Sequence, residues 1–201
     1  MKQQIIGLGL SLFVVHVLMY ITFMDRSIFW YLYSGTALVM IALSIIQTKL
    51  DHELSVGQYL LYGISSGILM YGIFLIGYQL MTFIPGNADN TISDLYQRIE
   101  PDHLWKYIVL FLIIIPGEEI FWRGFVQKCL HRHLSTSMAI ILTAVLAGSV
   151  FIFSGEWVWI MAAMVGGLFW GMLYAWKRSI PLVIVSHLTF DLLFFYVIPF
   201  L

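Results

Sequence analysis

Charge and cysteine are scarce in this sequence of 201 residues. Only 10% of the residues are charged and 61% are hydrophobic, whereas an average soluble domain is roughly 25% charged and about 45–50% apolar. One ordinary core cannot hide this much apolar surface, so we expect lipid to be the solvent for much of the chain. A net charge of −1 gives no electrostatic reason to expect a nucleic-acid partner. The single cysteine, Cys129, excludes an intramolecular disulfide framework and any multi-cysteine metal site.

No small-residue cleavage site closes the first apolar run, which continues from Ile5 to about Met24. The run is long enough to span a bilayer, so we expect a retained membrane helix rather than a removed signal peptide. Seven apolar stretches approach the length of about 20 helical residues that a bilayer core requires. The sequence therefore predicts an all-α fold, a polytopic bundle of about seven membrane helices. The stretches lie near Ile5–Met24, Ile28–Ile46, Gln58–Phe83, Leu104–Val126, Met138–Phe153, Trp157–Trp176 and Ile180–Phe200.

One clearly aqueous segment, from Pro85 to Asp102, interrupts these stretches, and we expect residues 1–201 to form a single integral membrane domain. A short chain without long soluble extensions is typical of a multi-pass protein of a bacterial cytoplasmic membrane. The positive-inside rule favours a cytoplasmic N-terminus, because that orientation places six of nine loop cations inside. The six are Lys2, Lys49, Lys128, Arg132, Lys177 and Arg178, and the other three are Arg26, Arg98 and Lys106.

Small and aromatic residues mark the sixth stretch. Gly167 and Gly171 are four residues apart and give this helix a face of small residues, which favours close packing against a neighbouring helix. We interpret this face as a packing surface. The tryptophans of this region lie mostly near expected helix ends, where amphipathic rings prefer the membrane interface. They are Trp157, Trp159, Trp170 and Trp176.

The fourth stretch carries two adjacent carboxylates, Glu118 and Glu119, followed by Arg123. Two carboxylates in a low-dielectric site cannot both ionise cheaply unless a cation or metal intervenes. On a helix, Arg123 lies one turn after Glu119 and can neutralise it, whereas Glu118 is rotated away by about 100°. We therefore expect Glu119 to be paired and Glu118 to be available as an acid or base. The alternative is an ion pair at a helix end with no chemical role.

The last stretch contains His187 and Asp191, which the i, i+4 spacing places on one helix face. An aspartate in mid-membrane costs roughly 2.5–3.5 kcal/mol on insertion scales, so it must face the bundle interior and find a partner. From the cytoplasmic ends of their helices, Glu118 lies about 12 Å deep and His187 about 10 Å deep. Because these depths match, we predict one polar site within the bilayer. The alternative is a histidine that only packs between helices.

Together these residues resemble the motifs of a known family. The run E-E-I-F-W-R-G-F, from Glu118 to Phe125, closely resembles the first motif of the CPBP family of intramembrane proteases, also called Abi. That family includes the type II CAAX prenyl proteases and bacteriocin self-immunity proteins. The pair His187-x-x-x-Asp191 resembles its closing motif, and residues 104–201 would form a CPBP-like core that carries the polar site. The resemblance implies an endopeptidase that hydrolyses peptide bonds of membrane-associated substrates.

The resemblance also implies a role for each motif residue. Glu118 would be the general base that activates a water, with Glu119 and Arg123 as its structural partners. His187 and Asp191 would hold the water or a metal, or stabilise the oxyanion. Whether a metal takes part is left open. Glu118 and His187 suit zinc as ligands, and they equally suit catalysis by a base and an oxyanion hole. The expected partners are membrane lipids and a membrane-associated peptide or protein.

A histidine is missing from the family's middle motif, a phenylalanine followed four residues later by a histidine on the next helix. No histidine occurs between His133 and His187, and its place falls at Phe151 or Gly155. His16 is another source of an imidazole, although we expect it to have an ordinary packing role. The absence supports a second hypothesis, a catalytically impaired relative that acts as a membrane immunity, scaffold or regulatory protein.

Overall fold

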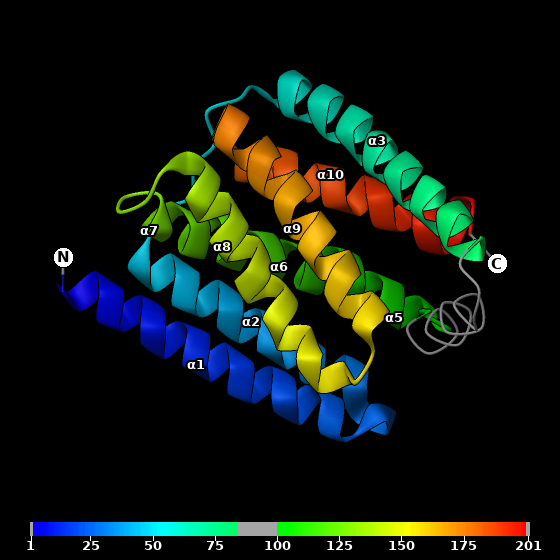
Figure 1. Ribbon diagram of the computed structural model, residues 1–201, viewed down its shortest axis with the longest axis horizontal. Helices are drawn as coiled ribbons and strands as arrows, with labels where there is room; N and C mark the ends of the chain where they lie inside the picture. The colour runs from blue at the N-terminus through cyan, green and yellow to red at the C-terminus, as the bar shows by residue number, and fades with distance from the viewer. Residues whose placement is uncertain (1, 84–99, 200–201) are drawn as a thin grey trace.

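The computed structural model describes residues 2–83 and 100–199, and its long elements are helices that lie alongside one another in a bundle (Figure 1). Six of these helices are long and apolar enough to cross a membrane, in agreement with the sequence. Three are extended by a short 3-10 or π segment: η1 (Arg26–Ile28) precedes α2, η4 (Val150–Ser154) follows α8, and η5 (Leu193–Val197) follows α10. The six are α1 (Lys2–Met24), α2 (Phe29–Gln47), α3 (Val56–Thr82), α8 (Thr136–Ser149), α9 (Trp157–Lys177) and α10 (Ile180–Leu192).

A further membrane-length helix runs without interruption from Leu104 to Leu130, and we call it the central helix. It alternates α and π geometry, and Pro116 lies inside it, where the ring removes one backbone hydrogen bond. With this helix the prediction of about seven membrane helices in an all-α fold is confirmed. Its segments are α5 (Leu104–Val109), η2 (Leu110–Ile114), α6 (Ile115–Glu119), η3 (Ile120–Gln127) and α7 (Lys128–Leu130).

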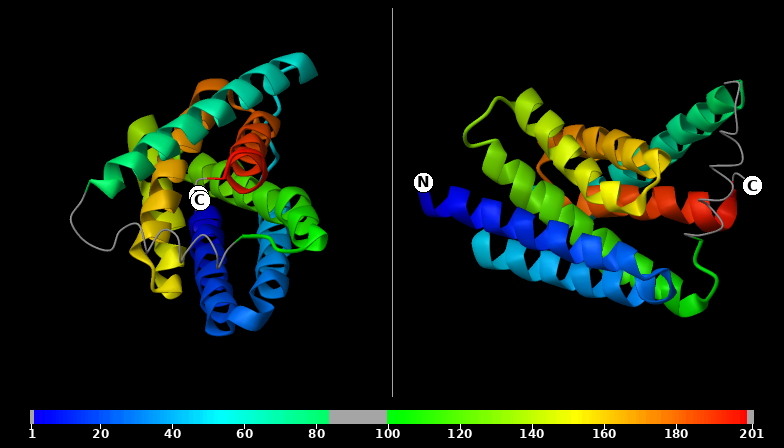
Figure 2. Two further views of the ribbon diagram at one scale, coloured as in Figure 1. Left: turned by 90° about the vertical axis from the view of Figure 1, so that its right-hand side faces the viewer. Right: turned by 60° about the horizontal axis from the view of Figure 1, so that its bottom comes forward.

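The central helix packs against α2, α8, α9 and α10, so the most polar helix lies inside the bundle. The right-hand view of Figure 2 shows it between α1 and α2 on one side and α8, α9 and α10 on the other. Large apolar side chains point outward from the surrounding helices, as expected for a protein whose solvent is lipid. Examples are Phe13, Ile46, Leu61 and Leu69, each at least 60% exposed.

Polar contacts join the loops at one end of the bundle. The backbone N–H of Ile180 donates to the carbonyl oxygen of Asp51 at 2.9 Å. The Asp51 carboxylate accepts from Lys128 Nζ and from the Tyr174 hydroxyl, both at 2.5 Å. Lys49, Lys128 and Arg178 therefore gather at one end, as the sequence predicts for cytoplasmic loops, although the orientation itself stays a prediction.

Candidate active site

Glu119 is fully buried between the central helix and α9 and α10. Its Oε1 accepts hydrogen bonds from Arg123 Nη1 at 3.1 Å and from His187 Nδ1 at 2.7 Å. Arg123 Nη2 also donates to the carbonyl oxygens of Gly166 (3.1 Å) and Gly167 (3.4 Å). The two buried charges thus have both a counter-charge and hydrogen-bond partners, which buried ions require. The predicted pairing of Glu119 with Arg123 is present.

The small face of α9 packs closely against α8, as predicted. A Cβ atom added to Gly167 would lie only 2.8 Å from the Cα of Ala144, so a larger residue would separate the two helices. The same stretch of α9 also serves the polar site, because Arg123 binds the carbonyl oxygens of Gly166 and Gly167. The prediction of a purely packing role was therefore incomplete.

Glu118 turns away from this network, as predicted from its rotation on the helix, and is half-buried. Its carboxylate accepts a hydrogen bond from the Tyr33 hydroxyl of α2. A close approach of α2 to the central helix permits this contact, because a Cβ on Gly117 would lie 2.9 Å from the carbonyl oxygen of Ala37. Ala37 is one turn after Tyr33, so Gly117 allows the tyrosine to reach Glu118.

His187 and Asp191 share one face of α10, as predicted, with His187 Nε2 3.9 Å from Asp191 Oδ2. The Trp170 indole of α9 stacks on the His187 imidazole, with ring centroids 3.7 Å apart and planes inclined by 22°. Trp170 Nε1 donates to Ser186 Oγ at 3.2 Å. Trp170 does not lie near an end of α9: its side chain is buried inside the bundle, against His187 of α10.

A cavity of about 420 Å³ lies between the central helix and α2, α3, α8, α9 and α10. Glu118, His187 and Asp191 all line it, so the structure brings the two predicted polar pairs together. Arg123 and Tyr33 also contribute to the lining. Most of the remaining wall is aliphatic or aromatic, and includes Ile73, Phe74, Leu110, Phe151, Trp159, Phe190 and Phe194.

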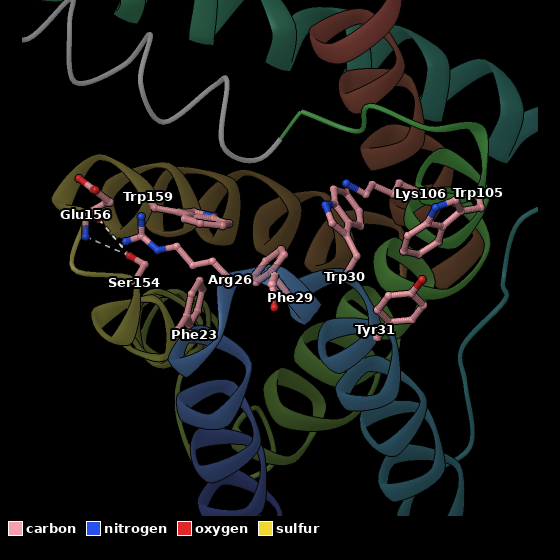
Figure 3. Close-up of a pocket in the computed structure, with 11 residues that line it drawn as sticks. Phe23, Arg26, Phe29, Trp30, Tyr31, Trp105, Lys106, Ser154, Glu156 and Trp159 are labelled. Atoms are coloured by element: carbon pink, nitrogen blue, oxygen red, sulfur yellow. Dashed lines mark hydrogen bonds between the residues drawn. The ribbon is translucent and has the colours of Figure 1, made fainter.

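A second cavity, of about 130 Å³, adjoins the first at the end of the bundle where α2 and α9 begin (Figure 3). Both cavities are lined by Phe29, Trp30 and Trp159. Arg26 and Lys106 line the smaller cavity from opposite sides of these rings. The polar site therefore extends toward the bundle end opposite the loop that carries Asp51.

The structure distinguishes the two places at which the middle-motif histidine is missing. Phe151 is buried, lines the large cavity and stacks on Trp159 at a centroid distance of 5.3 Å. Gly155 instead ends η4 in a left-handed conformation (φ 76°) and does not line the cavity. His16 bonds Ser149 Oγ at 3.0 Å and does not line the cavity either, so it has the packing role that was expected.

The donor set does not fit the tentative zinc site of Glu118 and His187. Among residues 2–83 and 100–199, no three His, Cys, Asp or Glu side chains are grouped to hold one metal ion. One imidazole nitrogen of His187 already faces Glu119, and protein zinc sites have at least three protein ligands. We therefore derive no chemical step through a metal.

Fold and site together define a polytopic membrane protein with a carboxylate–histidine site inside its helix bundle. Residues 100–193 match the family described as Type II CAAX prenyl endopeptidase Rce1-like. This match confirms the resemblance to CAAX-type proteases of the CPBP family, and it covers Glu118, Glu119, Arg123, His187 and Asp191. No curated protein and no solved structure gave a match.

Sequence reasoning did not single out two residues that touch the site, Tyr33 and Ser186. Tyr33 is one of 11 tyrosines and lies outside the matched segment, at the aromatic start of α2. Ser186 reaches the site through Trp170, and it also accepts a hydrogen bond from Ser66 of α3 at 3.0 Å. No spacing within one helix marks either residue, because both depend on contacts between helices.

Proposed function

We propose that the protein is an intramembrane endopeptidase that hydrolyses a peptide bond of a membrane-associated substrate with a glutamate-activated water. One observation carries the proposal: Glu118 faces the cavity that His187 and Asp191 also line, while Glu119 is engaged by Arg123 and His187. A general base must lie within reach of the proton that it abstracts. Glu118 meets this condition for a water that is held beside its carboxylate in the cavity.

The reaction would begin when this water transfers a proton to the Glu118 carboxylate and its oxygen attacks the peptide carbonyl carbon. Nε2 of His187 and the Asp191 carboxylate would hold the water, while the hydrogen bond from Nδ1 to Glu119 fixes the imidazole. Collapse of the tetrahedral intermediate breaks the C–N bond, and Glu118 returns the proton to the leaving nitrogen. One water is consumed, and an acid and an amine are formed.

A peptide that carries an apolar lipid group close to the scissile bond is the substrate class we propose. The description of the matching family names prenyl endopeptidases, and the mostly aliphatic and aromatic wall of the large cavity supports an apolar substituent. We further propose that residues 104–201 form the catalytic core and that α2 and α3 complete its cavity.

A bacterial cytoplasmic membrane, with the N-terminus inside, is the location we propose from the loop cations. Single-cysteine variants in a Cys129→Ser background test this orientation. A membrane-impermeant maleimide added to intact cells should label Ser27→Cys, whereas His133→Cys should react only after permeabilisation. The reverse pattern would invert the orientation.

The second candidate function is that of a catalytically impaired relative with an immunity, scaffold or regulatory role. One specific observation favours it: Phe151, one of the two places for the missing middle-motif histidine, is apolar and lines the cavity. Loss of a group that positions water or stabilises charge typically lowers the rate by about 10²–10³-fold.

Reconstitution in liposomes separates the two functions. Wild-type protein and Glu118→Gln are incubated with a farnesylated peptide ending in a CAAX sequence and with an unprenylated membrane-anchored peptide, and products are identified by mass spectrometry. Glu53→Gln, in an exposed loop, is the matched control. The protease proposal predicts cleavage by wild type and Glu53→Gln alone. No cleavage by any of the three would support the impaired relative.

A further inference from the structure

We propose that Tyr33 is a catalytic residue of this site, which donates a hydrogen bond to the oxyanion and so replaces the missing middle-motif histidine. The juxtaposition of the Tyr33 hydroxyl with Glu118 inside one cavity carries this inference. It rests on the proposed function, because it assumes that Glu118 activates a water. It adds to the family motifs a residue from α2, outside the matched segment 100–193.

The position of Tyr33 is fixed by its surroundings. Its side chain is only 7% exposed, and its ring lies 5.4 Å from that of Phe29, centroid to centroid. Both residues line the large cavity. Because Gly117 lets α2 approach the central helix, the ring spans the gap and its hydroxyl reaches Glu118. A donor held this way needs little reorganisation during the reaction, which is what makes oxyanion stabilisation effective.

The hydrogen bond from Tyr33 suits both stages of the reaction. In the resting site its O–H donates to the Glu118 carboxylate and thereby orients the base. When Glu118 takes the proton of the water it becomes a neutral acid and a weaker acceptor, while the peptide carbonyl oxygen gains the negative charge. The phenolic hydrogen favours two orientations in the plane of the ring and can flip from one to the other about the C–O bond. It can therefore turn to the oxyanion at the stage when that charge develops.

Two other hydrogen-bond donors at the cavity, Arg123 and Trp170, are engaged by groups other than Glu118. The Arg123 guanidinium binds Glu119 and two carbonyl oxygens of α9, and the Trp170 indole N–H binds Ser186. Phe151, one of the two places for the family histidine and the one that lines the cavity, has no side-chain donor. Tyr33 is hydrogen-bonded directly to the proposed base, so its hydroxyl lies beside the reacting atoms.

Tyr33→Phe tests the inference, since it removes the hydroxyl and keeps the ring. In liposomes with the prenylated peptide we expect kcat to fall by about 10²–10³-fold, with KM within about twofold of wild type because ground-state binding is unchanged. Tyr20→Phe is the matched control: this tyrosine of α1 is 50% exposed and lines neither cavity. It should retain the wild-type kcat.

A double substitution tests the replacement of the histidine. Phe151→His should raise kcat by a larger factor in the Tyr33→Phe background than in wild type, because two groups that serve one role are not additive. A wild-type kcat in Tyr33→Phe, or equal gains in both backgrounds, would overturn the role of Tyr33. Neither result would affect the proposed function, which fails separately if Glu118→Gln cleaves the peptide.

Discussion

Nδ1 of His187 lies 2.7 Å from Oε1 of Glu119, although the two residues are 68 positions apart in the sequence. This contact joins α10 to the central helix at the depth of the polar site. It also separates the roles of the adjacent carboxylates, because the site's histidine and arginine both bind Glu119 and leave Glu118 to the cavity.

Loss of the Arg123 side chain is expected to destabilise the fold. Arg123→Ala leaves the Glu119 carboxylate buried without its cation, and breaking a buried ion pair in this way typically costs about 3–5 kcal/mol. Thermal unfolding in detergent micelles, followed by circular dichroism, measures the effect. Arg132→Ala is the control, since Arg132 is exposed in the loop after the central helix. Equal melting temperatures for Arg123→Ala and wild type would show that the pair is dispensable.

A methyl group on Gly117 should separate α2 from the central helix. In Gly117→Ala the new Cβ would lie 2.9 Å from the carbonyl oxygen of Ala37, so the backbone must shift. Overpacking of this kind costs about 1–3 kcal/mol, and turnover should also fall as Tyr33 moves away from Glu118. Gly72→Ala serves as the control, because no atom lies within 4 Å of its added Cβ. If both alanine variants behave alike, the close approach has no importance.

Histidine at position 151 is expected to increase activity. Phe151 lines the cavity and Gly155 does not, so Phe151→His brings a new donor to the site whereas Gly155→His does not. Initial rates of peptide cleavage in liposomes compare both variants with wild type. A gain in Phe151→His alone agrees with the structure. A gain in Gly155→His and none in Phe151→His would contradict the choice of position 151.

Acid should weaken the contact that joins the loops near Asp51. Burial raises the pKa of the Asp51 carboxyl, but hydrogen bonds from Lys128 and Tyr174 outweigh it, so this pKa lies below its ordinary value. The unfolded chain therefore binds the proton more readily, and the stabilisation present above about pH 4 is lost as the pH falls below it. Melting temperatures between pH 3 and 6 should consequently fall more in wild type than in Asp51→Asn. Parallel curves would contradict this.

Much of the polar site could be predicted from single helices. The spacing of Glu119 and Arg123 fixes their contact within one helix, and the rotation of Glu118 follows from the same geometry. The depths of Glu118 and His187 below the membrane surface could also be compared from the sequence. The bilayer thickness sets where each helix begins and ends, so the number of residues from the helix end gives the depth. These predictions use only periodicity and depth.

Features that depend on which helices touch could not be predicted. Tyr33 reaches Glu118 because α2 packs against the central helix at Gly117, and nothing within α2 signals that contact. The contact between Trp170 and His187 could not be predicted for the same reason, since the two residues belong to different helices. The choice between Phe151 and Gly155 likewise required knowing which of them faces the cavity.

The central claim is that Glu118 performs the chemistry and Glu119 maintains the structure. Purified Glu118→Gln and Glu119→Gln, each measured for peptide cleavage and for melting temperature, test it most directly. We predict that Glu118→Gln melts like wild type but loses about 10²–10⁴-fold in rate, whereas Glu119→Gln melts at a clearly lower temperature. A Glu118→Gln protein that still cleaves at the wild-type rate would contradict the account.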